Sequence, residues 1–145
     1  MTYHNPVLLN DSVQSLIVNP NGVYVDLTFG GGGHSKAFLG ALDKGTLLSF
    51  DCDEDAEAKS KEIKDNRFRF IRSNYRFFRN FVRYFGYSSV DGIFADLGIS
   101  SHQIDEADRG FSFRFDAELD MRMNKQQKLT AKHIINQYDE NLLVT

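Results

Sequence analysis

Several residue types that mark specialised protein classes are scarce in this 145-residue chain. Cys52 is the single cysteine, which excludes an internal disulfide framework and a cysteine-rich zinc site and suits a reducing compartment. No apolar run approaches the roughly 18 to 20 residues that a membrane span requires. The N-terminus lacks a basic segment followed by an apolar one, so no secretory signal is predicted. We therefore expect a cytoplasmic, globular protein without membrane contact.

An overall excess of positive charge is also missing, because the formal net charge is -3 at pH 7. One segment nevertheless contains six arginines and no acidic residue. These arginines are Arg67, Arg69, Arg72, Arg76, Arg79 and Arg83. A local basic face acts on a partner even where the total charge does not. For any one of these arginines alone, a solvated helix face is the simpler interpretation.

Short apolar segments alternate with amphipathic segments over the first hundred residues. The predicted strands cover residues 23–27, 46–51, 68–71 and 90–98. The first predicted helix begins at Asp11 or Ser12, and the later ones cover residues 34–42, 54–64 and 75–86. Such alternation predicts an α/β fold with a parallel sheet and right-handed crossovers. From Ser100 the pattern loses its period, which predicts an ordered loop before a last helix capped by Thr130.

The segment DLTFGGGGHS, residues 26–35, places four consecutive glycines between a predicted buried strand and a predicted helix. A flexible linker would mix glycine with serine and other polar residues. At a strand-to-helix turn, glycine instead allows a tight turn and close approach of a ligand to the backbone N–H groups. We therefore interpret Gly30–Gly33 as a ligand cradle. The run alone is compatible with several nucleotide-binding patterns.

Three acidic residues stand at the predicted strand ends, namely Asp26, Asp51 and Asp96. We expect them to converge at the carboxyl edge of the sheet, where doubly wound folds bind ligands. Asp51 follows the glycines at the distance expected of a ribose-binding acid. Carboxylates repel a pyrophosphate but suit S-adenosyl-L-methionine, which carries a sulfonium, an ammonium and no phosphate. Any one of these aspartates also has a simpler interpretation as a helix or turn cap.

Four blocks of the sequence together resemble one enzyme family. They are HNPVLL (4–9), DLTFGGGGHS (26–35), DGIFADLGISSHQID (91–105) and RGFSFRFDAELDMRM (109–123). They resemble the bacterial S-adenosylmethionine-dependent methyltransferases that modify N4 of a cytidine in small-subunit (16S) ribosomal RNA. The resemblance implies a class I, Rossmann-like methyltransferase sheet. It also implies a cofactor-binding half-domain over residues 1–99, followed by a substrate-side loop and the start of a helical insertion over 100–145.

The same motif matching implies which residues contact the cofactor. The residues so implied are Gly32, Gly33, His34, Asp51, Tyr75, Asp96 and Gln103. Asp51 is expected to hold the ribose, and Tyr75 to lie by the adenine, where the family usually has phenylalanine. The histidines of the chain lack metal-ligand spacing, so no metal site is predicted.

Members of the resembled family are about twice as long as this chain, which ends inside the expected helical insertion. We therefore expect a fragment or truncated member in which strand four, within DGIFADL, forms an uncovered sheet edge. An edge of this kind predicts self-association through that strand. Three functions stay open: an RNA methyltransferase, a dinucleotide-dependent oxidoreductase, and an inactive cofactor-binding or assembly module. The incomplete G-x-G-x-x-G pattern and the acidic strand ends argue against the oxidoreductase.

For the methyltransferase hypothesis, Asp96 is the candidate catalytic residue. A hydrogen-bond acceptor at the exocyclic amine would localise the N4 lone pair and take up developing positive charge. The expected partner is small-subunit ribosomal RNA or the ribosomal subunit. Arg109, Arg114 and Arg122 are candidates for phosphate contacts. The alternative is that they form salt bridges within their own loop, to Asp108, Asp116, Glu118 or Asp120.

Overall fold

The computed structural model describes residues 8–144 of the chain. The chain divides into two compact units, Met1–Leu97 and Gly98–Thr145. Each unit has its own organisation.

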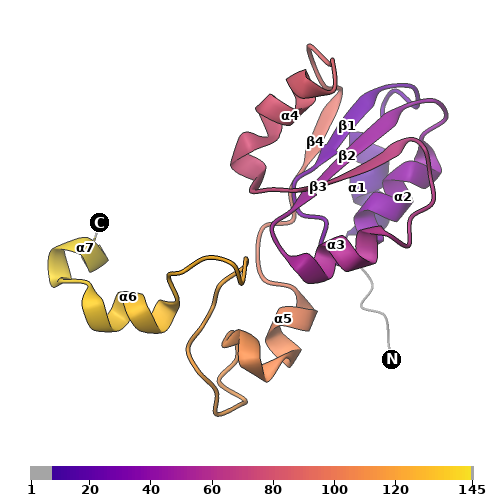
Figure 1. The fold of residues 1–145 in the computed structure, drawn as a ribbon. Helices are drawn as coiled ribbons and strands as arrows, with labels where there is room; N and C mark the ends of the chain where they lie inside the picture. The colour runs from indigo at the N-terminus through magenta and orange to yellow at the C-terminus, as the bar shows by residue number, and fades with distance from the viewer. Residues whose placement is uncertain (1–7, 145) are drawn as a thin grey trace. The chain divides into compact units, whose positions relative to one another are not determined.

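The first unit is built on a four-stranded sheet (Figure 1). Its strands are β1 (Val23–Asp26), β2 (Thr46–Asp51), β3 (Phe68–Arg72) and β4 (Gly92–Phe94). They are all parallel and lie in the order β3-β2-β1-β4. Parallel neighbours require crossover connections, and a helical segment lies in each of the three. The structure thus confirms the predicted parallel α/β sheet.

Helices cover both faces of this sheet (Figure 1). They are α1 (Leu9–Leu16), α2 (Gly33–Ala41), α3 (Glu54–Ser60), the short 3-10 helix η1 (Tyr75–Phe77) and α4 (Phe78–Tyr84). Alternate residues of a strand point to opposite faces. Tyr24 and Leu47 therefore pack with α1 and α2, whereas Val25 and Leu48 pack on the side of α4.

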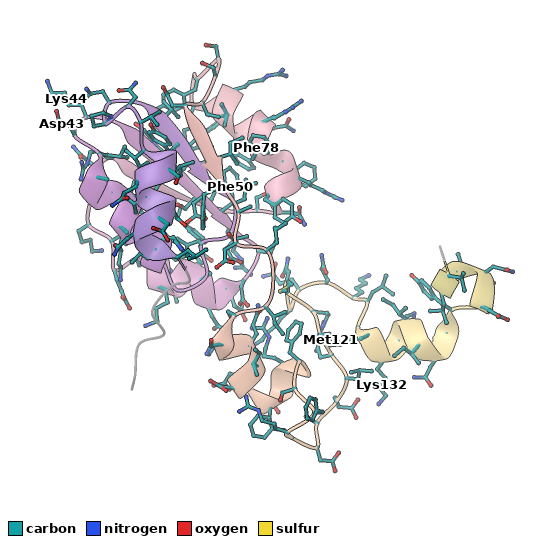
Figure 2. All side chains as sticks on the ribbon, turned by 180° about the vertical axis from the view of Figure 1, so that it is seen from behind. Asp43, Lys44, Phe50, Phe78, Met121 and Lys132 are labelled. Carbon is teal, nitrogen blue, oxygen red and sulfur yellow. The ribbon has the colours of Figure 1, made fainter. Side chains whose placement is uncertain are left out.

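The predicted apolar stripe of the fourth helix forms part of the second core cluster. Val82 is buried there, and Phe78, Phe81 and Phe85 pack against it. Figure 2 shows Phe78 of α4 close to Phe50 of β2, where the helix packs on the sheet. The structure thus confirms that these aromatic side chains belong to the core, as their helical spacing predicts.

Several predicted boundaries are wrong, for local reasons. The strand expected over 90–98 is reduced to β4, because β1 offers it only Tyr24–Asp26 as partners. The first helix begins at Leu9, so Asp11 lies in its first turn instead of capping it. α3 ends at Ser60, where two successive hydrogen bonds of three-residue span tighten the chain.

The second unit contains short helices and a long irregular loop. Its helical segments are α5 (Ser101–Asp105), η2 (Ala107–Arg109), α6 (Ala131–Gln137) and α7 (Glu140–Val144). The Thr130 hydroxyl accepts a hydrogen bond from the His133 backbone N–H at 3.1 Å, which confirms the predicted cap of α6. The sequence pattern did not predict α5, η2 or α7. No helix in residues 8–144 combines the length and apolar character needed to cross a membrane.

Candidate functional site

The glycine run is an ordered turn between β1 and α2, not a linker. Gly30 and Gly32 have positive φ angles of 52° and 80°, and Gly32 caps α2. A Cβ atom on Gly32 would lie 2.7 Å from the Phe29 ring, so this position has no room for a side chain. A Cβ atom on Gly31 would meet nothing within 4 Å. The protein's own packing therefore does not require glycine at position 31, and the space beside that backbone is open.

Asp51, at the end of β2, is joined directly to this turn. Its Oδ2 accepts a hydrogen bond from the Gly30 backbone N–H at 2.8 Å, and its Oδ1 accepts one from the Asp53 N–H at 3.0 Å. Partial burial raises the pKa of Asp51, although these N–H groups favour its charged form. A carboxylate has about four lone-pair sites, so Asp51 keeps acceptor capacity for a ligand hydroxyl.

Asp26 lies at the carboxyl end of β1, as predicted, but its side chain does not face solvent there. It is fully buried at the end of β1. Its Oδ2 accepts a 2.6 Å hydrogen bond from the Ser35 hydroxyl of α2, and that hydroxyl lies 2.8 Å from the Ser49 hydroxyl of β2. Burial raises the pKa of Asp26. The carboxylate thus ties α2 to the sheet below the glycine turn.

Asp96 is exposed and lies two residues after β4. Its backbone N–H donates to the Thr28 hydroxyl at 2.7 Å, while the Thr28 N–H donates to Asp26 Oδ1 at 3.0 Å. Thr28 therefore ties the chain after β4 to the chain after β1. The sequence analysis missed this residue, although an aspartate two residues before it is the usual signal of such a side-chain turn.

His34 and Tyr75 occupy different environments in the first unit. His34 is buried, and its ring centroid lies 4.5 Å from that of Phe94 on β4. Tyr75 is 44% exposed at the start of η1. Two residues earlier, the Ser73 N–H donates to the backbone oxygen of Asp51 at 2.9 Å, which joins the chain after β3 to the end of β2. Contacts of His34 and Tyr75 with a cofactor stay predictions.

Gln103 belongs to the second unit and forms a capping box for α5 there. Its backbone N–H donates to the Ser100 hydroxyl at 3.2 Å, and its side-chain oxygen accepts from the Ser100 N–H at 3.0 Å. Its Nε2 donates to the sulfur of Met123 at 3.2 Å. The predicted cofactor contact of this residue stays a prediction.

The three candidate RNA-binding arginines mostly follow the alternative hypothesis of contacts within their own loop. Arg109 is only 2% exposed, and its guanidinium donates to the backbone oxygens of Arg122 and Met123, so the prediction of a phosphate contact for it is wrong. Arg122 pairs with Asp120 at 2.6 Å, which lowers the pKa of that carboxyl. Exposed Arg114 pairs with Asp105 at 2.8 Å, an acid that the sequence analysis did not consider.

The comparison with protein families identifies the chain's relatives. Residues 1–145 match the family described as the MraW methylase family. The chain belongs to this family. The resemblance inferred from the four sequence blocks is thereby confirmed, although residues 4–7 of the first block lie outside the described residues. Membership in a methylase family implies a methyl donor of the S-adenosylmethionine type.

Curated relatives of this family member carry a common name, ribosomal RNA small subunit methyltransferase H. The chain is 56% identical over 142 residues to the protein of that name from Phocaeicola vulgatus, covering 97% of this chain and 46% of that protein. It is 54% identical over 143 residues to the one from Bacteroides fragilis, with 98% and 46% covered. For Christiangramia forsetii the identity is 54% over 144 residues, with 99% and 47% covered. The chain spans about half the length of the curated relatives it matches.

Proposed function

We propose that the first unit binds S-adenosyl-L-methionine and that the chain forms part of a methyltransferase acting on N4 of a cytidine in small-subunit ribosomal RNA. The observation that carries the proposal is the 2.8 Å hydrogen bond between Asp51 Oδ2 and the Gly30 N–H. It sets an acid with remaining acceptor capacity beside an open glycine turn. Relatives of known name act on small-subunit ribosomal RNA, which supports the proposed substrate.

The residues around the turn fit the chemistry of this cofactor. The hydroxyl groups of its ribose are hydrogen-bond donors, and the Asp51 carboxylate can accept hydrogen bonds from them. Its sulfonium and ammonium groups are cationic, and Asp51 and Asp96 supply negative charge at the carboxyl ends of β2 and β4. Open space beside Gly31 allows a ligand to lie against the backbone.

When bound, the cofactor supplies an electrophilic methyl group. In the proposed reaction the N4–carbon bond forms as the carbon–sulfur bond breaks, and N4 then loses a proton. Asp96 is the candidate group at this amine, because it is exposed at the carboxyl end of β4. Its carboxylate would accept the N4 hydrogen, which localises the nitrogen lone pair for attack. The cytidine must leave its stack to reach the site, at a cost of a few kcal/mol.

The cofactor assignment is tested by calorimetric titration of this chain with S-adenosyl-L-methionine and, separately, with NAD. We expect binding of the former only. Asp51→Ala should weaken that binding about 10- to 100-fold, because ribose hydroxyls lose a charged acceptor and the turn loses its anchor. The control is Asp43→Ala, which removes an exposed aspartate from the turn before β2. Equal affinity of the Asp51 variant and the wild type would contradict the ribose role.

The catalytic assignment is tested by methyl transfer to small ribosomal subunits. Asp96→Asn keeps the size of the side chain but removes its charge. We expect transfer to fall about 100-fold, the scale of a lost acid–base group, and cofactor affinity to fall much less than transfer. Normal turnover would remove Asp96 from the chemistry. If the wild-type chain bound the cofactor and transferred no methyl group, the hypothesis of an inactive binding module would replace the catalytic one.

A further inference from the structure

We propose that four exposed arginines on and beside α4 form a phosphate-binding face for RNA. This arginine face consists of Arg69, Arg76, Arg79 and Arg83. The proposal rests on the proposed function in one respect, since it takes RNA as the partner. It goes beyond that function by assigning contacts with RNA phosphates to four arginines that are not among the proposed cofactor-binding residues.

The packing of α4 determines where its arginines point. Phe78, Phe81 and Val82 turn toward the sheet and its second core cluster. Arg79 and Arg83 are four residues apart, so they lie on the same side of the helix, and both are exposed. Because this apolar side of α4 packs on the sheet, the two guanidinium groups are exposed to solvent.

The arginine face has no acidic counterpart, unlike the other two arginines of the same segment. Arg67 pairs with Asp65 at 2.6 Å, and Arg72 pairs with Glu57 at 3.1 Å. Among residues 8–144, no ion pair involves the four arginines of the face. Like charges four residues apart on a helix destabilise it. A bound polyanion would remove that repulsion.

Aromatic rings hold two of these guanidinium groups in place. The Arg76 guanidinium lies over the Phe77 ring at 4.5 Å, and that of Arg69 lies over the Phe85 ring at 5.4 Å. Such contacts restrict long side chains before a ligand arrives, which lowers the entropy lost on binding. Phe85 follows the end of α4, so Arg69 extends the face from β3 to that end of the helix.

Exposed aromatic side chains beside the arginines favour RNA over other polyanions. Tyr84 of α4 is 80% exposed, and Phe77 is 40% exposed. Bases stack on such rings, whereas phosphates pair with the neighbouring cations. α4 has seven residues and is therefore about 10 Å long, so its arginines can contact only a short stretch of one strand. The chemistry that the face recognises is thus a short stretch of RNA backbone with accessible bases.

The test is the salt dependence of RNA binding by the 145-residue chain. A fluorescein-labelled polyuridine oligonucleotide is titrated at several salt concentrations, and the slope of log K against log salt is measured by anisotropy. The triple variant Arg76→Gln, Arg79→Gln, Arg83→Gln should lower the magnitude of this slope by about 2, since each single-strand phosphate contact contributes about 0.7. Arg69 stays in place because it belongs to strand β3 of the sheet, whereas the other three arginines lie on η1 and α4.

A matched control removes three positive charges elsewhere in the first unit. Lys44, Lys61 and Lys64 are exposed and take part in none of the ion pairs described for residues 8–144. Figure 2 shows Lys44 well apart from Phe78 of α4. We expect the triple Lys→Gln variant to keep the wild-type slope. Replacing Arg76, Arg79 and Arg83 by lysine should also keep the wild-type slope, because the positive charges remain.

The outcomes separate this proposal from the proposed function. Circular dichroism and calorimetry with S-adenosyl-L-methionine confirm that each variant is folded and keeps its cofactor affinity. If the slope of log K against log salt is unchanged in the arginine variant, the proposed phosphate-binding face is wrong, whether or not that variant still binds the cofactor. Equal losses in the arginine and control variants also overturn it, because they show an effect of net charge alone. Failure of the wild-type chain to bind the cofactor contradicts the proposed function and leaves the slope comparison intact.

Discussion

Each of the two units of this chain is stabilised internally by a different kind of interaction. In the first, twelve hydrophobic side chains of residues 8–97 are buried, and ten of them form the two core clusters on the faces of a parallel sheet. In the second, the buried residues are Gln103 and Arg109, and none of its described hydrophobic side chains is buried. Phe113, for instance, is fully exposed. An apolar core therefore orders one unit, whereas hydrogen bonds to backbone groups order the other.

This difference predicts different responses to mutation. An apolar core is shared by many elements, so its loss is felt throughout the unit. A buried guanidinium serves only the carbonyl groups that it touches, and its loss acts locally. The largest effects on global stability should thus come from the first unit.

Phe38→Ala should produce the largest effect. This α2 side chain is fully buried, and its ring packs edge-on against Phe94 at 5.1 Å. Truncation of a buried phenylalanine costs about 3–5 kcal/mol in free energy of unfolding. Phe113→Ala, the same change at an exposed site in the second unit, should cost nearly nothing. Urea unfolding followed by circular dichroism measures both, and similar values for the two would contradict the comparison.

Arg109→Ala should have a smaller and local effect. The backbone oxygens of Arg122 and Met123 lose their guanidinium donor, at a cost of about 1–3 kcal/mol. Hydrogen exchange detected by mass spectrometry should show faster exchange across residues 107–123 and unchanged exchange in the sheet. Arg114→Ala is the control, because its pair with Asp105 is exposed. Faster exchange in β1 or β2 would show that the second unit supports the first.

Asp26→Asn should have the smallest effect, and one that depends on pH. Burial raises the pKa of Asp26 above its ordinary value of 3.8, so the folded state holds this proton to higher pH than the unfolded state. Ionised Asp26 therefore lowers stability above its folded pKa, and this penalty disappears as the pH falls toward 3.8. The unfolding free energy of the wild type, measured relative to the variant, should rise between pH 7 and about pH 4. Asp43→Asn, which changes an exposed aspartate in the same unit, is the control variant.

The sequence predicts the first unit well because its order comes from periodic apolar residues. The runs VYVD and TLLSFD are buried on both faces, and both strands lie where the pattern predicts them. Strand β4 was predicted too long because its extent depends on the length of its partner β1, which no local pattern contains. The buried role of Asp26 also depends on a residue from another element, Ser35.

The second unit escaped prediction for a related reason. Its turns depend on contacts between residues about eight to thirteen positions apart in the chain, which a local sequence pattern does not contain. A Cβ atom on Gly110, for instance, would lie 2.6 Å from the backbone oxygen of Glu118. Only its helix caps have local signals, and Thr130 was predicted on that basis. Among the predicted site residues, the structure joins Asp51 to the glycine turn, and the cofactor contacts stay predictions.

The position of β4 at the sheet edge has a consequence for chain entropy. β1 and β2 pair across a short connection, Val23 with Thr46, but β1 and β4 pair Tyr24 with Gly92. Closing this roughly threefold longer loop costs about 1 kcal/mol more. The Asp91 carboxylate closes the ends of that loop, since it accepts hydrogen bonds from the Val23 N–H at 2.8 Å and from the Asn19 amide at 3.3 Å. The hydrogen bonds of this single side chain thus offset part of the entropy cost of pairing β4 with β1.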